Sequence, residues 1–170
     1  MVIFRFSIKV LQNCDEIVDA GFTVSGIYRV DPLDGWGGFA VHCDQQTAGG
    51  GWTTILRRYD GSLDLNRGWS AYVNGLGDIT GEYWMGLNTI RRVTGANEFT
   101  IRFDLEAPDG EKRYAEYAGS ALGNFRTKFR ITVGTYSGER NNPQSGYSTR
   151  YSQRRLQNTD FGNFRFSVVN

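Results

Sequence analysis

The sequence is poor in residues that hold metal ions, since it has two cysteines, Cys14 and Cys43, and one histidine, His42. This set is too small for a four-ligand zinc site of the usual kinds. The two cysteines either form one disulfide, which indicates an oxidising compartment, or remain two buried thiols. Long apolar runs are missing as well, because no segment approaches the roughly 20 apolar residues that cross a bilayer. We therefore expect no membrane partner.

The N-terminus lacks the pattern of a signal peptide. Arg5 and Lys9 interrupt the apolar stretch, and no small-residue cleavage site precedes Cys14. Apolar residues alternate over residues 2–10 instead, which is typical of a strand. If the protein is secreted, this segment does not show how.

The net charge is close to zero, at +1, but the charged residues are unevenly distributed along the chain. Residues 1–116 have 11 basic and 16 acidic side chains, whereas residues 117–170 have 8 basic and 2 acidic ones. An acidic majority over most of the chain argues against a general nucleic-acid binder, so no nucleic-acid partner is expected. The arginines Arg150, Arg154 and Arg155 are flanked by aromatic residues, which predicts either a polyanion contact, such as a sulfated glycan, or a solvated tail.

Glycine and aromatic residues are abundant, with 22 glycines and 14% aromatics against only 3 prolines. This composition indicates a turn-rich mixed or β fold whose rings fill the core. Trp52, Trp69 and Trp84 are the predicted core residues, and a carbohydrate-stacking surface is the alternative.

Hydrophobic periodicity predicts an α+β fold, with a mainly antiparallel sheet and short helices. The predicted strands cover residues 21–30, 38–43, 52–58, 98–105, 113–117 and 128–133. Helices are expected at 69–73 and 81–92, with Glu82 in the first turn of the second. A last strand is predicted near the C-terminus, through Phe164, Phe166 and Val168.

Catalytic patterns are weak, and we predict no enzyme and no catalytic residues. His42 has no clear nucleophile partner, so a structural role is favoured. The glycines at 49–51 lead into a strand, which favours a tight turn over a phosphate-binding loop. The carboxylates Asp104, Glu106, Asp109, Glu111 and Glu116 flank a hairpin, where glycosidase-like pairing is conceivable. Cross-strand ion pairs with Arg102, Lys112 and Arg113 are favoured.

Several motifs lie in collinear order between residues 14 and 138. In one-letter code they are GFTVSGIY at 21–28, FAVHCD at 39–44, GGGWT at 49–53, RRYDGS at 57–62, GEYWMGL at 81–87, RFDLE at 102–106, YAEY at 114–117 and YSG at 136–138. Together they resemble the fibrinogen C-terminal domain family, which includes ficolins, tenascins and angiopoietin-like proteins. The resemblance implies a disulfide between Cys14 and Cys43 that closes a small N-terminal lobe.

The resemblance ends after Gly138. In the family a third lobe follows, with a calcium loop, a second disulfide and a ligand pocket, but residues 139–170 contain no cysteine, histidine or tryptophan. Only Glu139 and Asp160 are acidic there, too few for the six to eight oxygens that calcium prefers. We therefore expect no metal and no cofactor, and the ligand-binding residues stay unknown.

The predicted organisation has three parts. These are an N-terminal extension at 1–13, a truncated fibrinogen-like domain with the first two lobes at 14–138, and a divergent tail at 139–170.

The resemblance implies an extracellular, secreted recognition or adhesion module in innate immunity, matrix or signalling. Its partner would be an acetylated glycan, bound in a lectin-like way, or an extracellular receptor or matrix protein. The alternative is a truncated relative without ligand binding that acts through protein or polyanion contacts. Because the family sheet receives C-terminal strands, we also expect an unpaired edge and self-association, unless residues 164–168 fill that edge.

Overall fold

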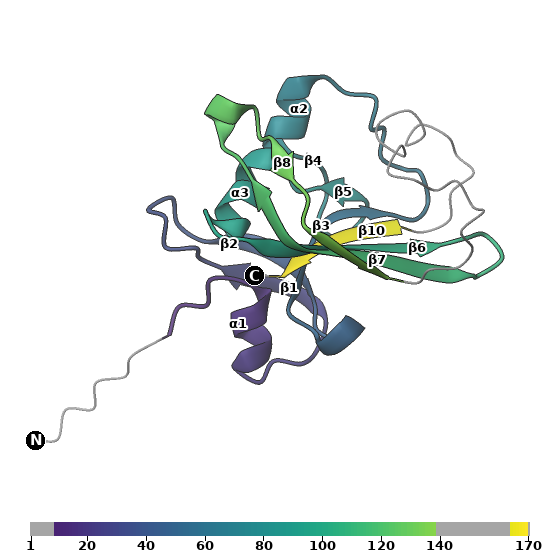
Figure 1. The fold of residues 1–170 in the computed structure, drawn as a ribbon, viewed down its shortest axis with the longest axis horizontal. Coiled ribbons are helices and arrows are strands. Elements are labelled where there is room, and N and C mark those ends of the chain that lie inside the picture. Colours follow the sequence, from purple (N-terminus) through teal and green to yellow (C-terminus); the bar gives the residue numbers. More distant parts are fainter. Residues whose placement is uncertain (1–8, 139–163, 170) are drawn as a thin grey trace, which may run out of the picture.

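The computed structural model describes residues 9–138 and 164–169 (Figure 1). Its helices are α1 (Cys14–Asp19), α2 (Trp69–Asn74) and α3 (Leu87–Thr94), with 3-10 turns at Thr47–Gly49 and Phe125–Thr127. Its strands are β1 (Gly26–Val30), β2 (Phe39–Asp44), β3 (Trp52–Arg58), β4 (Leu76–Gly77), β5 (Tyr83–Trp84), β6 (Phe99–Glu106), β7 (Lys112–Leu122), β8 (Ile131–Thr132), β9 (Thr135–Gly138) and β10 (Phe164–Val169). The predicted α+β class is confirmed.

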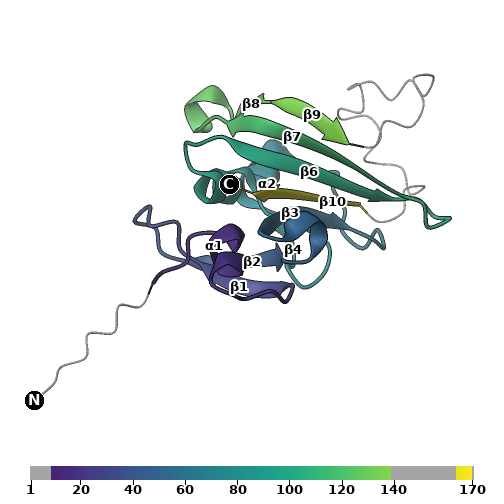
Figure 2. The ribbon, with the colours of Figure 1, turned by 60° about the horizontal axis from the view of Figure 1, so that its bottom comes forward.

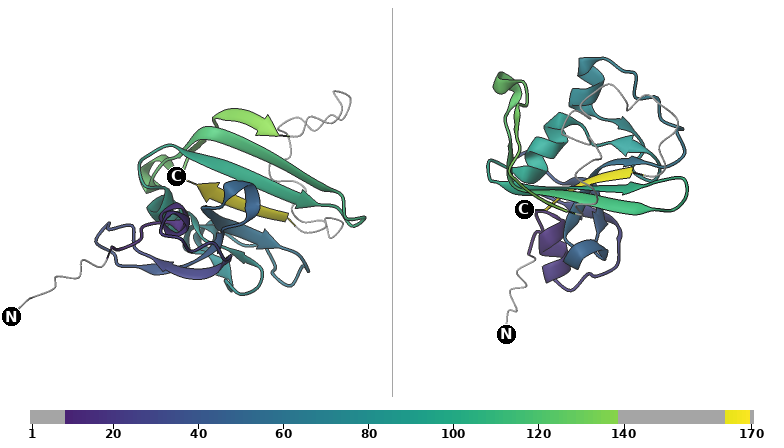
Figure 3. Two further views of the ribbon diagram at one scale, coloured as in Figure 1. Left: turned by 90° about the horizontal axis from the view of Figure 1, so that it is seen from below. Right: turned by 45° about the vertical axis from the view of Figure 1, so that its right-hand side comes forward.

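One antiparallel sheet organises the described residues, in the order β1-β2-β3-β10-β6-β7-β8 (Figure 2). Strand β9 also pairs with β7, and the short β5 pairs with β3 and β4. Helix α1 lies on one side of the sheet, and α2 and α3 lie on the other (Figures 1 and 3). The sheet therefore separates a small N-terminal lobe from the two central helices.

The C-terminal strand β10 lies inside the sheet. It pairs antiparallel with β3, where Val168 is opposite Thr53, and with β6, where Val168 is opposite Ile101. The predicted strand is thus confirmed, and it fills the expected vacancy in the sheet by pairing on both sides. Residues 164–169, which the sequence assigns to a divergent tail, supply an interior strand of the sheet.

The predicted helix at 81–92 is divided in the structure. Residues 83–84 form β5, and α3 begins only at Leu87. Gly86 separates them with φ 88°, and a Cβ there would lie 2.6 Å from the Asn74 carbonyl carbon. This close approach requires glycine and prevents the helix from extending back from Leu87 to Trp84.

The sequence analysis missed helix α1. The Asn13 side chain caps it by accepting a hydrogen bond from Glu16 N–H at 2.9 Å, and Glu16 Oε2 accepts one from Gln12 N–H at 2.9 Å. This arrangement resembles a capping box, so Asn13 followed by Glu16 was a usable signal. The predicted strand at 128–133 shrinks to β8, because Lys128 and Phe129 both have φ 52°.

Two of the three predicted core tryptophans are confirmed. Trp52 is buried, and Trp84 is half-buried with its Nε1–H donating to the Tyr72 carbonyl at 2.7 Å. Trp69 is 54% exposed, so its assignment to the core is wrong.

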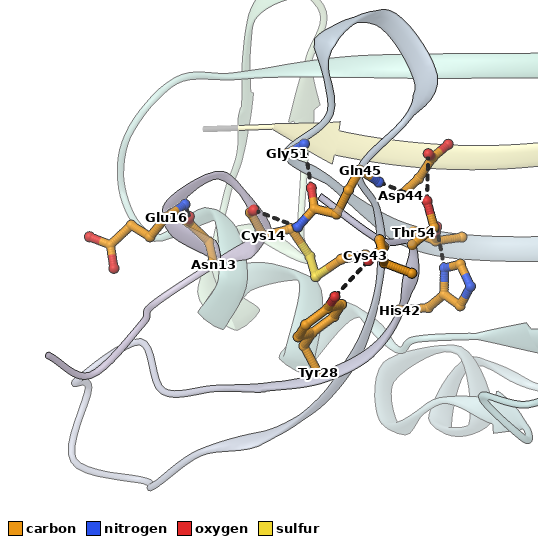
Figure 4. Close-up of a disulfide and its surroundings, with 12 residues drawn as sticks. Asn13, Cys14, Glu16, Tyr28, His42, Cys43, Asp44, Gln45, Gly51 and Thr54 are labelled. Atoms are coloured by element: carbon orange, nitrogen blue, oxygen red, sulfur yellow. Dashed lines mark hydrogen bonds between the residues drawn. A yellow bond between two sulfur atoms is a disulfide. The ribbon is translucent and has the colours of Figure 1, made fainter. Parts of the chain in front are cut away.

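The disulfide joins Cys14 at the start of α1 to Cys43 in β2, and both residues are fully buried (Figure 4). Buried Gln45 strengthens this junction, because its Nε2 donates to the Cys14 carbonyl at 3.1 Å. Its Oε1 accepts from Gly51 N–H at 2.8 Å. The lobe is therefore closed by one covalent and two polar links.

Replacing both cysteines by serine is expected to lower the free energy of unfolding by about 3–4 kcal/mol, the chain-entropy value for a loop of this size. Urea unfolding of the double variant measures this loss. Reduced wild-type protein serves as the control and should lose a similar amount. Equal stability with and without reductant would contradict the prediction.

Candidate functional site

A charged face of the sheet arises from the alternation of β6. Phe99 and Ile101 are buried in the main core, with Phe103 packed against it. Arg102 and Asp104 alternate with them and therefore project from the opposite face.

An ion-pair chain crosses this face. Arg165 of β10 pairs with Asp44 of β2 and, through its guanidinium Nη2, with Asp104 Oδ2 at 3.0 Å. Arg102 Nε contacts Asp104 Oδ1 at 2.8 Å, and its Nη1 pairs with Glu116 of β7. The chain thus links four strands and fixes the side-chain positions across the middle of the sheet.

Asp44 anchors one end of this chain. Burial opposes its charged form, but hydrogen bonds from Thr47 and Gln46 and the charge of Arg165 outweigh that effect. The pKa of Asp44 therefore lies well below its usual range, and the carboxylate remains charged.

An open hollow of about 690 Å³ lies beside the ion-pair chain. We call it the arginine hollow, and it is lined by Thr47, Arg57, Arg58, Tyr59, Arg102, Asp104, Leu105, Glu106, Lys112, Arg113, Tyr114 and Arg165. Its volume falls within the range of small-molecule ligand pockets.

Most positive charges in the arginine hollow are neutralised. Beyond the chain described above, the pairs are Arg58 with Glu82 at 3.8 Å, Lys112 with Glu106 at 3.8 Å, and Arg113 with Glu111. The hollow therefore lacks the cationic surplus that a polyanion site needs.

Arg57 differs from the other cations of the hollow. Among the residues that the structure describes, it has no carboxylate partner within 4 Å, and its guanidinium lies 5.1 Å from the centre of the Tyr59 ring. Arg102 covers the Tyr114 ring in the same way, at 4.3 Å. Each of these tyrosine rings thus has a guanidinium group over one face.

The charged residues predicted at the hairpin form ion pairs that stabilise the sheet. Arg102 with Glu116 and Lys112 with Glu106 are opposite each other on β6 and β7, so the expected cross-strand ion pairs are confirmed there. Arg113 pairs instead with Glu111, close to it in sequence.

His42 Nδ1 lies 3.3 Å from Thr54 Oγ1, and burial lowers the pKa of the imidazole. Residues 49–51 form the expected tight turn, with positive φ at all three glycines.

Arg150, Arg154 and Arg155 lie outside the described residues, as do residues 2–8 of the expected N-terminal strand, whose residues 9–10 form no strand. The sequence analysis missed Arg57, Arg165 and Asp44. Alternation in the last strand places Arg165 opposite the Val168 face, but no sequence signal identifies its distant partners.

Metal ligands are not clustered in the part of the chain that the structure covers. In residues 9–138 and 164–169, no group of three histidine, cysteine, aspartate or glutamate side chains is placed to hold an ion. The calcium implied by the family resemblance therefore has no fitting ligand set there. Nor does any helix in these ranges have the length and apolarity to cross a membrane.

Comparison with known proteins agrees with this sheet and disulfide. The family model described as the fibrinogen beta and gamma chains, C-terminal globular domain, matches residues 10–164. The chain belongs to this fibrinogen C-terminal domain family. Among solved structures, the chain is similar to the fibrinogen-like globe domain of human ANGPTL6. The TM-score is 0.72 and the identity 34%, over 78% of this chain and 59% of that one.

Curated relatives of this fibrinogen-like chain include fibrinogen-like protein 1 of Rattus norvegicus, which is 39% identical over 137 residues. That match covers 79% of the chain and 43% of the relative. Angiopoietin-related protein 7 of Mus musculus is 37% identical over 134 residues, covering 78% of the chain and 40% of the relative. The chain thus spans about two fifths of the length of these relatives.

A lamprey fibrin D-dimer, solved in complex with the peptide ligand Gly-His-Arg-Pro-amide, is also similar. Its TM-score is 0.71 and its identity 30%, over 86% of this chain and 48% of that one.

Proposed function

We propose that this fibrinogen-like domain is an extracellular, non-enzymatic recognition module that binds a segment of another protein in the arginine hollow. A buried disulfide supports the extracellular location, because disulfides persist in oxidising compartments. The relatives, fibrinogen-like and angiopoietin-related proteins, support a recognition role, and the lamprey fibrin structure contains a peptide ligand.

The position of Arg57 is the observation on which this proposal rests. Among the described residues, Arg57 is the cation of the open hollow that has no carboxylate partner, so its guanidinium is the one offered to a ligand carboxylate. Its contact with Tyr59 restricts its motion and lowers the entropy lost on binding. Arginine and tyrosine are also enriched among residues that dominate protein interfaces.

Acetylated glycans are less well supported at this site. Sugar recognition uses free aromatic faces, whereas a guanidinium group lies over one face of Tyr59 and over one face of Tyr114. A mixed-charge protein segment with one acidic side chain fits the balanced charges and Arg57 better. Polyanion contact through Arg150, Arg154 and Arg155 stays a separate prediction.

Arg57→Gln is expected to weaken binding of acidic-centred peptides at least tenfold, because it removes one charge-assisted hydrogen-bonding pair. The probe is an array of capped nine-residue peptides with a central Glu, Gln or Lys, followed by anisotropy titration of the tightest binder.

Arg29→Gln is the matched control, since Arg29 is exposed on β1 and outside the hollow, and it should leave peptide binding unchanged. Equal loss in both variants would contradict the proposal. Absence of any peptide binding, or retention on N-acetylglucosamine resin in its place, would also overturn it.

A further inference from the structure

We infer that the outer edge formed by β8 and β9 pairs with the same edge of a second copy of this chain. The segment concerned, residues 131–138, is called the β8–β9 edge below. It lies beyond β7 on the side of the sheet opposite β1 (Figure 2). The inference does not depend on the arginine hollow.

The β8–β9 edge is paired with β7 along one side. β7 contacts β8 through Ala121 and Leu122, and it contacts β9 through residues 115–118. No other described strand pairs with β8 or β9. Alternate backbone N–H and C=O groups of such an edge point outward and can pair with another chain.

The side chains of this edge favour association. Ile131, Val133 and Tyr136 are 50%, 52% and 40% exposed. The segment ITVGTYSG contains no charged residue and no proline, the two features that commonly block edge-to-edge pairing. Phe125, in the turn between β7 and β8, is also exposed, at 70%.

The opposite edge of the sheet is guarded. Strand β1 has Arg29 exposed on it. The incoming chain also covers its end, because Asp31 N–H donates to the Leu11 carbonyl at 2.9 Å. Among the described strands, this contrast with β1 singles out the β8–β9 edge as the unguarded one, with no partner strand on its outer side.

A second copy fits this edge because a two-fold contact places like residues near each other. An uncharged segment avoids the repulsion that this symmetry imposes on charges, and the chain's net charge of only +1 adds little. Antiparallel pairing about a two-fold axis between Gly134 and Thr135 would place Val133 opposite Tyr136 of the second copy. Pairs of β-branched and aromatic side chains stabilise sheets.

Sedimentation velocity over a range of protein concentrations tests the inference. The wild type is expected to form dimers at micromolar concentrations, and Ile131→Lys with Val133→Lys to weaken dimerisation at least tenfold. The matched control is Ile27→Lys with Val24→Lys, which adds the same charges at residues that are 48% and 69% exposed beside the guarded edge. It should dimerise like the wild type.

Hydrogen exchange supplies an independent measurement. Amides in residues 131–138 of the wild type should become more protected as its concentration rises, and thermal melts should show that both variants are folded. A wild type that stays monomeric at high concentration would overturn the inference. Dimers that persist in the folded Ile131→Lys, Val133→Lys variant would overturn it as well.

Discussion

Val168→Asp is expected to abolish cooperative folding. Val168 is 1% exposed, lies in the main core and belongs to β10, the strand between β3 and β6. The substitution loses about 1.5–3 kcal/mol of apolar burial, and the unpaired carboxylate costs several kcal/mol more. Domains of this size have a free energy of unfolding of roughly 5–15 kcal/mol, so this substitution removes most of the stability of the fold. Near-UV circular dichroism and thermal melts measure the loss.

Val24→Asp is the control for the same chemical change, because Val24 is 69% exposed. We expect a change in the free energy of unfolding within about 0.5 kcal/mol for this variant. In the wild type, amides of residues 165–168 should exchange as slowly as those of β6. Exchange at unstructured-chain rates, or a folded Val168→Asp variant, would refute the interior position of β10.

Glu82→Gln is expected to destabilise the domain by about 3 kcal/mol. The Glu82 carboxylate is buried and accepts backbone N–H groups from Tyr59, Asp60, Gly61 and Leu63 at 2.6–3.0 Å. Glutamine replaces one acceptor oxygen by a donor that faces these N–H groups. Buried donors are then left unpaired, at about 1–3 kcal/mol each. Chemical unfolding at neutral pH measures the difference.

The same carboxylate makes stability depend on pH. Burial alone would raise the pKa of Glu82, but the four backbone hydrogen bonds outweigh it and lower the pKa from 4.5 to about 2. A depressed folded-state pKa stabilises the fold above the unfolded value, and this stabilisation is lost as pH falls from about 4.5 through 2. The shift corresponds to about 3 kcal/mol.

Between pH 5 and pH 2, the free energy of unfolding should therefore fall more steeply with decreasing pH in the wild type than in Glu82→Gln. Asp109→Asn is the control, because Asp109 is an exposed loop carboxylate that accepts one backbone hydrogen bond, from Glu111. It should follow the wild-type curve. Identical curves for all three proteins would show that Glu82 does not determine the acid sensitivity.

Glu82 also illustrates a limit of sequence patterns. Its spacing from later apolar residues suggests the first turn of a helix, whereas the structure uses it to order the turn at residues 59–63. Helical periodicity continues across Gly86, and only the close approach of Asn74 at that point ends it. Local patterns cannot reveal such a constraint, because the contacting residue is far away in the sequence.

The candidate site shows the same division. Alternation along β6 placed Arg102 and Asp104 on one face, and the hairpin predicted their pairing with residues of β7. The partners Asp44 and Arg165 lie more than 50 residues from β6, so only the sheet order brings them together. That order also isolates Arg57 from carboxylates among the described residues.

The sequence by itself determined the family and the α+β class, because motif order and alternation are local and collinear. The Cys14–Cys43 disulfide followed only as an implication of the family resemblance. The sequence also showed that the last residues form a strand. The tertiary structure decided that this strand lies between β3 and β6, that Glu82 orders a distant turn, and that no described strand covers the outer side of the β8–β9 edge. Strand order and edge exposure depend on contacts between residues far apart in the chain, and periodicity encodes which face a residue occupies but not which strand it meets.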